Sequence, residues 1–520
     1  MTATDIFNDW PNNSGFDVFH EETTPVELTV KGQIPEYVRG VLYRTGPGNY
    51  TVPTEKGTTF TMQHWFDGFG QTHRFQLLSP TKVLYNSRRS CDELIEHIRS
   101  TGSLPSSFSF AQRRDPCQSL WRKFFTTFHS EYSQLRGPSG ANICVTLSLD
   151  MPGLPATASD GKRSLYAKTD ATVLQGLDPE TLEPVGICNQ TKLHPELKGQ
   201  LSSAHSQRCP ETSDTFNYNT ELGKTTKYRV FRVCAATGKT EILATITDAP
   251  AAYIHSFFLT KNYVVLCVFS AHFGLGGLKI LYHKNMLDAL DDVAPHKKAL
   301  WYVVPRKVGS AAIKKYSGRA FFAFHSANAW EENGGIVAEV PAFDSIDIIK
   351  KFYLNHIKAD SAEARKWVDK AKPSYTRFWL PEVEKVGTGF VETVWERPGD
   401  VSMELPAINP LYKTKPHRFT YGLVFRGKST MMDGLVKHDN SPEQKHLLWE
   451  KHAHTPGEAI FIPDPAGTEE DDGVLLTVVL DGRSGLSYLL VLDAKTMREV
   501  ARAEMDWAVP FGFHGTFGRI

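Results

Sequence analysis

The chain of 520 residues lacks the features of several large protein classes. No stretch approaches the roughly 20 apolar residues that a membrane-spanning helix needs, so we expect no helical membrane span. The 58 basic and 58 acidic side chains cancel, which argues against nucleic acid or another polyanion as a partner. The N-terminus has no positive region followed by an apolar run, so we also expect no secretory signal.

Cysteine is scarce and its spacing is uninformative for metal binding. The seven cysteines include no CxxC pair, and their odd number argues against a disulfide framework or a zinc ribbon. Reduced thiols in a cytoplasmic compartment are expected instead. A Walker motif, a nucleophile elbow and a CxxH haem signal are also missing, so the sequence indicates no organic cofactor.

Short strand-like segments rich in β-branched and aromatic residues occur throughout the chain. They are separated by Asp-Gly turns, and hydrophobic residues make up 41% of the sequence, enough for a sizeable core. The clearest strand segments are Lys227–Val233, Asn262–Phe269, Arg319–Phe324, Phe419–Phe425, Val474–Leu480 and Ser487–Leu492. We therefore expect an all-β fold.

A strand–turn–strand pattern recurs in Leu177–Val185, Ala236–Ile242 and Leu492–Val500. Such repeats are typical of the outer hairpin of a propeller blade, at roughly 45 residues per blade. Separate β-sandwiches are the alternative, but no Pro/Ser/Gly-rich or charged spacer divides the chain. We predict one β-propeller domain over residues 1–520.

Two regions depart from the β pattern. The segment 344–372 has helical stretches and reads as an insertion between blades. The segment Asp115–Phe128 places Leu120, Trp121, Phe124 and Phe125 on one face of a helix beside basic residues. This composition suits a helix in a membrane interface, and it equally suits a helix packed on the core.

Four histidines stand in apolar, aromatic or small-residue surroundings, where a solvated ring is not expected. They are His205, His255, His325 and His514. Four neutral imidazoles around one ion suit Fe, Zn or Cu, and leave Fe(II) its full charge and open positions. The sharper interpretation is a redox enzyme with a four-histidine iron centre. The plainer one is four unrelated core histidines.

At these histidines and five further motifs the chain resembles the carotenoid cleavage oxygenases over nearly its whole length. The other motifs are Gly40–Gly48, His64–Gly68, Glu404–Asn409 and Pro456–Pro463, together with the segment Asp115–Phe128. The resemblance implies a seven-bladed β-propeller, closed by a helical and loop cap that includes residues 90–135, with non-haem iron on its axis. By that likeness the four histidines are the iron ligands.

The same resemblance implies three carboxylates that hold the ligand rings. It pairs Asp170 with His255, Glu404 with His325, and Glu458 with His514. A carboxylate that accepts the second N–H of a ligating histidine fixes its tautomer and orientation. Asp170 stands where Glu is usual in the family. Because Asp is one methylene shorter, we expect it to hold His255 either through a water or by means of a shifted backbone.

Thr169, placed among the catalytic residues, helps to predict the substrate. Stilbene-cleaving members carry Lys there to hold a phenolic hydroxyl, so a stilbene substrate is disfavoured. The resemblance favours a lipophilic carotenoid or apocarotenoid, such as torulene or β-carotene, cleaved with dioxygen (O2) to aldehydes such as retinal or an apocarotenal. A substrate dissolved in lipid favours peripheral attachment to a membrane or lipid droplet, and Cys117 matches a position that some relatives acylate.

Two other functions remain open. A retinoid isomerohydrolase uses the same iron site in some relatives and consumes no dioxygen. A non-catalytic, lipid-binding propeller needs none of the four histidines and would hold no stoichiometric iron.

Overall fold

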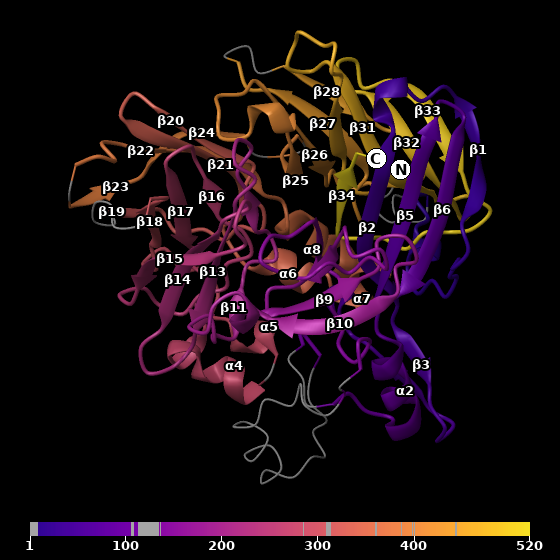
Figure 1. Ribbon diagram of the computed structural model, residues 1–520, viewed down its shortest axis with the longest axis horizontal. Helices are drawn as coiled ribbons and strands as arrows, with labels where there is room; N and C mark the ends of the chain where they lie inside the picture. Colours follow the sequence, from indigo (N-terminus) through magenta and orange to yellow (C-terminus); the bar gives the residue numbers. More distant parts are fainter. Residues whose placement is uncertain are drawn as a thin grey trace.

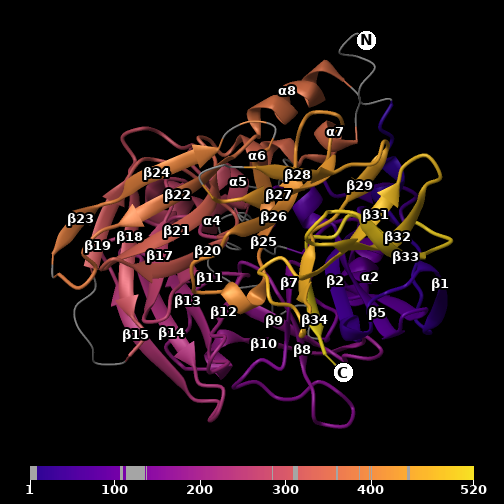
Figure 2. The ribbon, with the colours of Figure 1, turned by 90° about the horizontal axis from the view of Figure 1, so that it is seen from above.

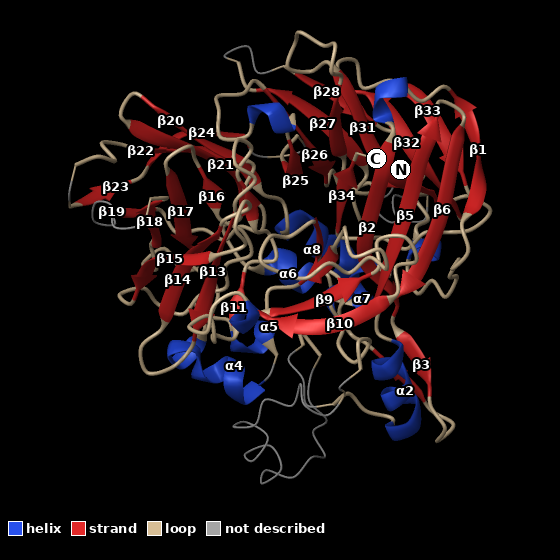
Figure 3. Ribbon diagram, viewed as in Figure 1, coloured by secondary structure: helices blue, strands red, loops and turns tan. Residues whose placement is uncertain are grey.

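Strands dominate the structure, and their sheets surround a common centre in a propeller-like arrangement (Figures 1 and 3). The computed structural model describes residues 9–105, 109–112, 135, 137–283, 285–307, 314–358, 361–385, 387–397, 399, 401–441 and 445–519. The prediction of an all-β, propeller-like fold is confirmed.

The largest sheet contains ten strands from both ends of the chain. Its order is β29 (His454–Pro456), β31 (Gly473–Asp481), β32 (Leu486–Asp493), β33 (Glu499–Glu504), β1 (Val26–Gly32), β6 (Lys82–Arg89), β5 (Phe69–Ser79), β2 (Gly40–Asn49) and β34 (His514–Gly518), with β30 (Ile460–Pro463) also beside β31.

Five further sheets hold four or five strands each. The first two contain β7 (Thr146–Leu149), β8 (Leu165–Lys168), β9 (Val173–Leu177) and β10 (Pro184–Asn189), then β11 (Leu201–Ser202), β12 (Gln207–Arg208), β13 (Thr215–Glu221), β14 (Lys227–Val233) and β15 (Thr240–Ile246). The third contains β16 (Phe258–Leu259), β17 (Tyr263–Val268), β18 (Ala299–Pro305), β19 (Lys314–Gly318) and β23 (Thr388–Phe390). The last two contain β20 (Asn328–Glu332), β21 (Gly335–Ala342), β22 (Ser374–Leu380) and β24 (Glu392–Arg397), then β25 (Met403–Ala407), β26 (Phe419–Val424), β27 (Gly434–Asp439) and β28 (His446–Trp449). A hairpin of β3 (Thr51–Pro53) and β4 (Thr59–Thr61) stands apart.

The number of sheets differs from the seven separate blades that the resemblance implies. Among the described residues there are six sheets of four or more strands. Strand β1 is the physical reason, because it pairs with β33 through Thr29–Gly32 and with β6 through Val26–Leu28. A strand that is hydrogen-bonded along both edges joins two groups of strands into one sheet.

The two ends of the chain are joined in this sheet. Strand β34 pairs antiparallel with β2, and His514 lies opposite Thr45. All ten residues of β2 are buried. This pairing fixes the backbone of the last strand, and with it the place of His514.

Aromatic rings hold neighbouring sheets together. Trp301 of β18 stacks on Phe258 of β16 with 5.5 Å between ring centroids, and it meets Phe378 of β22 edge to face at 5.4 Å. Strands β18 and β22 belong to different sheets, so these contacts join one sheet to the next. Large buried rings contribute much apolar area and prefer offset or edge-to-face geometry.

Helices are few and short. On the lower side in Figure 1 lie α2 (Asp92–Thr101), α4 (Leu278–His283) and α5 (Met286–Ala289). Between β21 and β22 the chain forms α6 (Asp347–Lys351), α7 (Leu354–Ile357) and α8 (Ala362–Lys370), which lie together in Figure 2. No helix in the described part of the chain is long and apolar enough to cross a bilayer.

Candidate metal centre and its pocket

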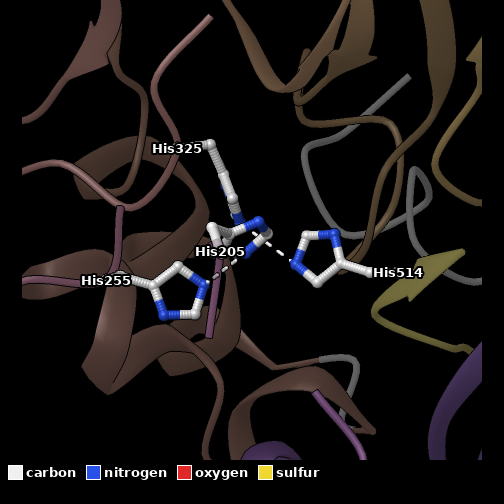
Figure 4. A group of neighbouring side chains, drawn as sticks. All are labelled: His205, His255, His325 and His514. Atoms are coloured by element: carbon white, nitrogen blue, oxygen red, sulfur yellow. Dashed lines mark hydrogen bonds between the residues drawn. The ribbon is translucent and has the colours of Figure 1, made fainter. Parts of the chain in front are cut away.

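Four histidines from separate parts of the chain point toward one another (Figure 4). His205 lies between β11 and β12, His255 precedes β16, His325 precedes β20, and His514 begins β34. Each sits in or beside a strand at the edge of its sheet. The sheets surround one centre, so these positions meet although 309 residues separate the first histidine from the last.

One nitrogen from each ring faces a common point. These four atoms all lie within 4.8 Å of one another. The Nε2 atoms of His205 and His255 are 3.0 Å apart, and those of His325 and His514 are 3.2 Å apart. The interpretation that these are four unrelated core histidines is therefore inconsistent with their arrangement.

Carboxylates occupy the far side of three of the four rings. The Nδ1 atom of His514 lies 2.8 Å from Glu458 Oε1, and that of His325 lies 2.5 Å from Glu404 Oε2. A carboxylate oxygen only accepts hydrogen bonds, so Nδ1 is the donor, and a neutral ring then has its lone pair on Nε2. Among the described residues, the contacts found for His205 include no carboxylate.

The shorter carboxylate of the third pair reaches its histidine directly, and not through the water that was one of the two expected arrangements. Asp170 Oδ2 lies 2.8 Å from His255 Nδ1, so the contact is direct and needs no bridging water. The hydroxyl of Tyr253 donates to the same oxygen at 2.8 Å, and the amide of Ala204 donates to Oδ1 at 3.1 Å. Burial raises the pKa of Tyr253 well above its usual value, which keeps its hydroxyl a donor. These donors hold the shorter carboxylate against the ring.

A local irregularity turns Glu404 toward His325. The pairing of β25 with β26 shifts register between Glu404 and Ala407, and Leu405 has a φ of 51°. Bulges of this kind redirect side chains and are common beside active sites. The amide of Leu405 donates to Glu404 Oε2 at 2.8 Å. The backbone amide of Leu405 thus helps to fix the carboxylate of Glu404, which in turn orients His325.

Glu458 is supported from behind by a buried arginine. Arg44 Nη1 lies 2.8 Å from Glu458 Oε2, and the amide of Gly515 donates to the same oxygen at 2.8 Å. Burial by itself raises the pKa of Glu458, but His514 and Arg44 more than offset this and lower it below its usual value. Glu458 therefore remains an anion at neutral pH.

His205 and His514 carry the neutral state that metal binding requires. Burial, together with the three neighbouring rings, lowers the pKa of His205 well below its usual value. Burial also lowers the pKa of His514 to about 4, although Glu458 acts in the opposite direction. Neutral imidazoles with convergent Nε2 lone pairs form a donor set for Fe, Zn or Cu. The residues present therefore fit a metal ion.

An apolar cavity reaches this cluster. It encloses about 1680 Å³, including its open end, and His255, His325 and His514 lie in its wall. Thr169 and Asp170 also line it. Its aromatic walls consist of Trp65, Phe66, Phe110, Tyr253, Phe324, Phe352, Phe425 and Phe513. A cavity of this volume and lining suits a large apolar ligand.

The residues named for membrane binding lie outside the described part of the chain. These are Leu120, Trp121, Phe124 and Phe125, and Cys117 is also outside it. The other six cysteines are free.

Two supporting residues of the cluster were not assigned from the sequence. Tyr253 stands two positions before His255, and Arg44 lies in the Gly40–Gly48 motif. The motifs contain both residues, but only the folded chain shows that they contact Asp170 and Glu458. A tyrosine and an arginine have many ordinary structural uses, so the pattern by itself gave no signal.

Fold and site together define a propeller-like β protein with a four-histidine centre at the end of an apolar cavity. The family model described as retinal pigment epithelial membrane protein matches residues 15–519. The chain belongs to this family, and the family membership predicted from the motifs is confirmed.

Similar proteins extend over almost the whole chain. A carotenoid dioxygenase of Neurospora crassa is 40% identical, covering 98% of this chain and 92% of its own. A torulene dioxygenase of Fusarium fujikuroi is 39% identical, covering 97% and 93%. The solved structure of a Synechocystis apocarotenoid oxygenase variant superimposes with a TM-score of 0.77 at 21% identity, covering 98% of both chains. This last likeness bears on the fold alone.

Proposed function

We propose that the protein is an oxygenase that cleaves one conjugated C=C bond of a carotenoid or apocarotenoid with dioxygen. The observation that carries the proposal is the convergence of four histidines, three of which lie in the wall of an apolar cavity. The similarity to a carotenoid dioxygenase and a torulene dioxygenase supports it. The cleaved alkene and O2 together supply all atoms of two carbonyl products, such as retinal or an apocarotenal.

His205, His255, His325 and His514 would hold Fe(II) through their Nε2 atoms. A bound iron(II) ion would supply the redox-active centre for the use of dioxygen, with no organic cofactor. The chain's own part is positional. Asp170, Glu404 and Glu458 orient three rings and keep their Nδ1 atoms protonated, so that the lone pairs stay directed at one point.

The cavity wall would choose the substrate and place it. Apolar and aromatic side chains bind a polyene by excluding water, and a rod in a narrow cavity presents only certain bonds to the histidines. Thr169 in this wall has no charge with which to bind a phenol as Lys would. A long C40 polyene such as torulene or β-carotene, or a shortened apocarotenal, is the proposed substrate.

We also infer that residues 1–520 form one seven-bladed propeller domain. The ten-stranded sheet separates at β1 into a group ending at β33 and a group from β1 to β34. These two groups and the five other sheets make seven. Residues around 90–135 and 344–372 would form the cap and the helical insertion.

Attachment to a lipid surface would bring the enzyme to its substrate. Leu120, Trp121, Phe124 and Phe125 remain the proposed contact. Cytoplasmic location with peripheral attachment to a membrane or lipid droplet stays a prediction.

Product analysis tests the function. The Fe(II)-loaded protein is incubated with β-carotene, torulene, a long apocarotenal and resveratrol, in air and under argon. We expect aldehydes from a polyene in air only, with lengths that identify the cleaved bond. No aldehyde from any polyene despite bound iron would contradict the proposal. Hydrolysis of a retinyl ester without oxygen uptake would then identify an isomerohydrolase, and a protein without stoichiometric iron would point to a binding propeller.

A further inference from the structure

The carboxylate of Asp67 lies in the cavity wall and binds backbone amides of a distant segment. Asp67 ends a short 3-10 helix, η3 (Trp65–Asp67), and is 7% exposed. Its Oδ1 accepts from the amide of Phe110 at 2.6 Å and its Oδ2 from that of Ala111 at 2.8 Å, while the amide of Gln112 donates to the same carboxylate. One side chain thus satisfies three consecutive N–H groups.

Helix η3, which carries Asp67, is itself held by hydrogen bonds to the region around α6. The side chain of His64 bonds the carbonyl of Ile349 at 2.8 Å, and the amide of Trp65 donates to the carbonyl of Phe352 at 2.9 Å. His64 is fully buried. Through Asp67, the segment that carries Phe110 is therefore held in a fixed place relative to the region around α6.

The held segment places the ring of Phe110 in the cavity wall, with the ring of Tyr253 between it and His255. Phe110 packs on Phe66, with ring centroids 4.7 Å apart, and on Tyr253 at 5.8 Å. Tyr253 in turn donates to Asp170, which holds His255. Phe66, Phe110 and Tyr253 all line the cavity. The hydrogen bonds from the backbone amides to Asp67 thus fix a part of the wall that is connected to His255 through Tyr253.

We propose that Asp67 is a positioning residue that selects the cleaved bond, because it holds the Phe110 ring in the cavity wall against Tyr253. This inference rests on the proposed function. A polyene is a rod of repeated double bonds, so a wall that shifts along the rod changes which bond faces the histidines. A misplacement near 1 Å is enough to change reactivity strongly.

The substitution Asp67→Asn tests this with little change in size. An amide offers one acceptor oxygen, and its NH₂ group opposes the remaining N–H donors. Asp178→Asn is the matched control, since Asp178 is 8% exposed and accepts from the amides of Ser159, Glu180 and Thr181. Asp178 does not line the cavity.

With β-carotene as the probe, we expect Asp67→Asn to change the ratio of aldehyde products of different length and to raise KM, while Asp178→Asn matches the wild type. We also expect the amides of Phe110 and Ala111 to exchange hydrogen about tenfold faster or more, the factor for one lost hydrogen bond to a charged group. An unchanged product ratio in a folded Asp67→Asn protein would overturn the proposal.

A second variant keeps the test decisive if Asp67→Asn does not fold. Phe110→Leu changes the wall directly and must also shift the product ratio. In the double variant, Asp67→Asn should add no further shift, because its effect passes through the Phe110 ring. A Phe110→Leu protein with wild-type products, or fully additive shifts, would refute the inference. If the wild type makes no aldehyde, the proposed function itself has failed.

Discussion

Arg44 and Glu458 form an ion pair inside the protein, with 2.8 Å between Arg44 Nη1 and Glu458 Oε2 and side chains only 4% and 15% exposed. The other oxygen of Glu458 accepts from His514. One carboxylate thus joins strand β2 to the last histidine of the cluster. Burial makes each partner depend on the other, because a buried charge left alone is costly.

Replacing Arg44 should damage both stability and metal binding. Arg44→Met leaves Glu458 buried without its partner, and we expect a loss of about 3 kcal/mol in the free energy of unfolding. Iron affinity should fall about tenfold or more, since His514 loses a firm support. Urea unfolding and iron titration measure these effects. Arg39→Met, at an exposed ion pair with Glu36, is the control and should change stability by less than about 1 kcal/mol.

Removal of a single cluster histidine should abolish stoichiometric iron. His325→Ala deletes one of four donors and leaves Glu404 without its ring contact. We expect iron content and polyene turnover to fall together, measured by metal analysis and product formation. His446→Ala, at an exposed position on β28, should keep both. Full iron and full turnover in His325→Ala would disprove the ligand assignment.

The hydroxyl of Tyr253 should help to hold Asp170 against His255 and so increase iron affinity. Tyr253→Phe removes the hydrogen bond to Asp170 and keeps the ring in the cavity wall. We expect iron affinity to fall about tenfold, the lower range for loss of such outer contacts. Tyr166→Phe removes a hydrogen bond to the carbonyl of Pro155 outside the site and should leave iron affinity unchanged. Equal affinities in all three proteins would show that Asp170 needs no support from Tyr253.

Acid should destabilise the protein through buried histidines outside the cluster. Burial lowers the pKa of His64 and of His73 to about 3, from 6.5. The unfolded chain takes up protons below pH 6.5, but the folded chain does so only near pH 3. Their stability contribution is therefore complete above pH 6.5 and is lost as the pH falls toward 3.

At pH 5 each of these histidines binds a proton in the unfolded chain but not in the folded one, which should lower the free energy of unfolding by roughly 2 kcal/mol per histidine relative to neutral pH. His73→Phe removes one of them, so its stability should fall less between pH 7.5 and pH 5 than that of the wild type. Urea unfolding at the two pH values measures the difference. Equal losses in the two proteins would mean that His73 does not drive the acid sensitivity.

The motifs allowed the family, the all-β fold and the four histidines to be named, because these features depend on local residue types and their order. The pairing of Asp170 with His255 was also named from the motifs, but the way in which the shorter side chain reaches the ring was not. Side-chain length suggested a water or a shifted backbone, and the structure shows a direct contact in which Tyr253 and Ala204 hold Asp170 by hydrogen bonds. Such donors come from other segments, and no local pattern announces them.

The sequence by itself determined which side chains are available: four histidines in apolar surroundings, three carboxylates, and an aromatic content of 11%. Only the tertiary structure decided that the four Nε2 atoms face one point, that β1 merges two groups of strands, and that Arg44 and Tyr253 support the cluster. The physical reason is distance along the chain. Contacts between residues far apart in sequence depend on how whole sheets pack around a common centre.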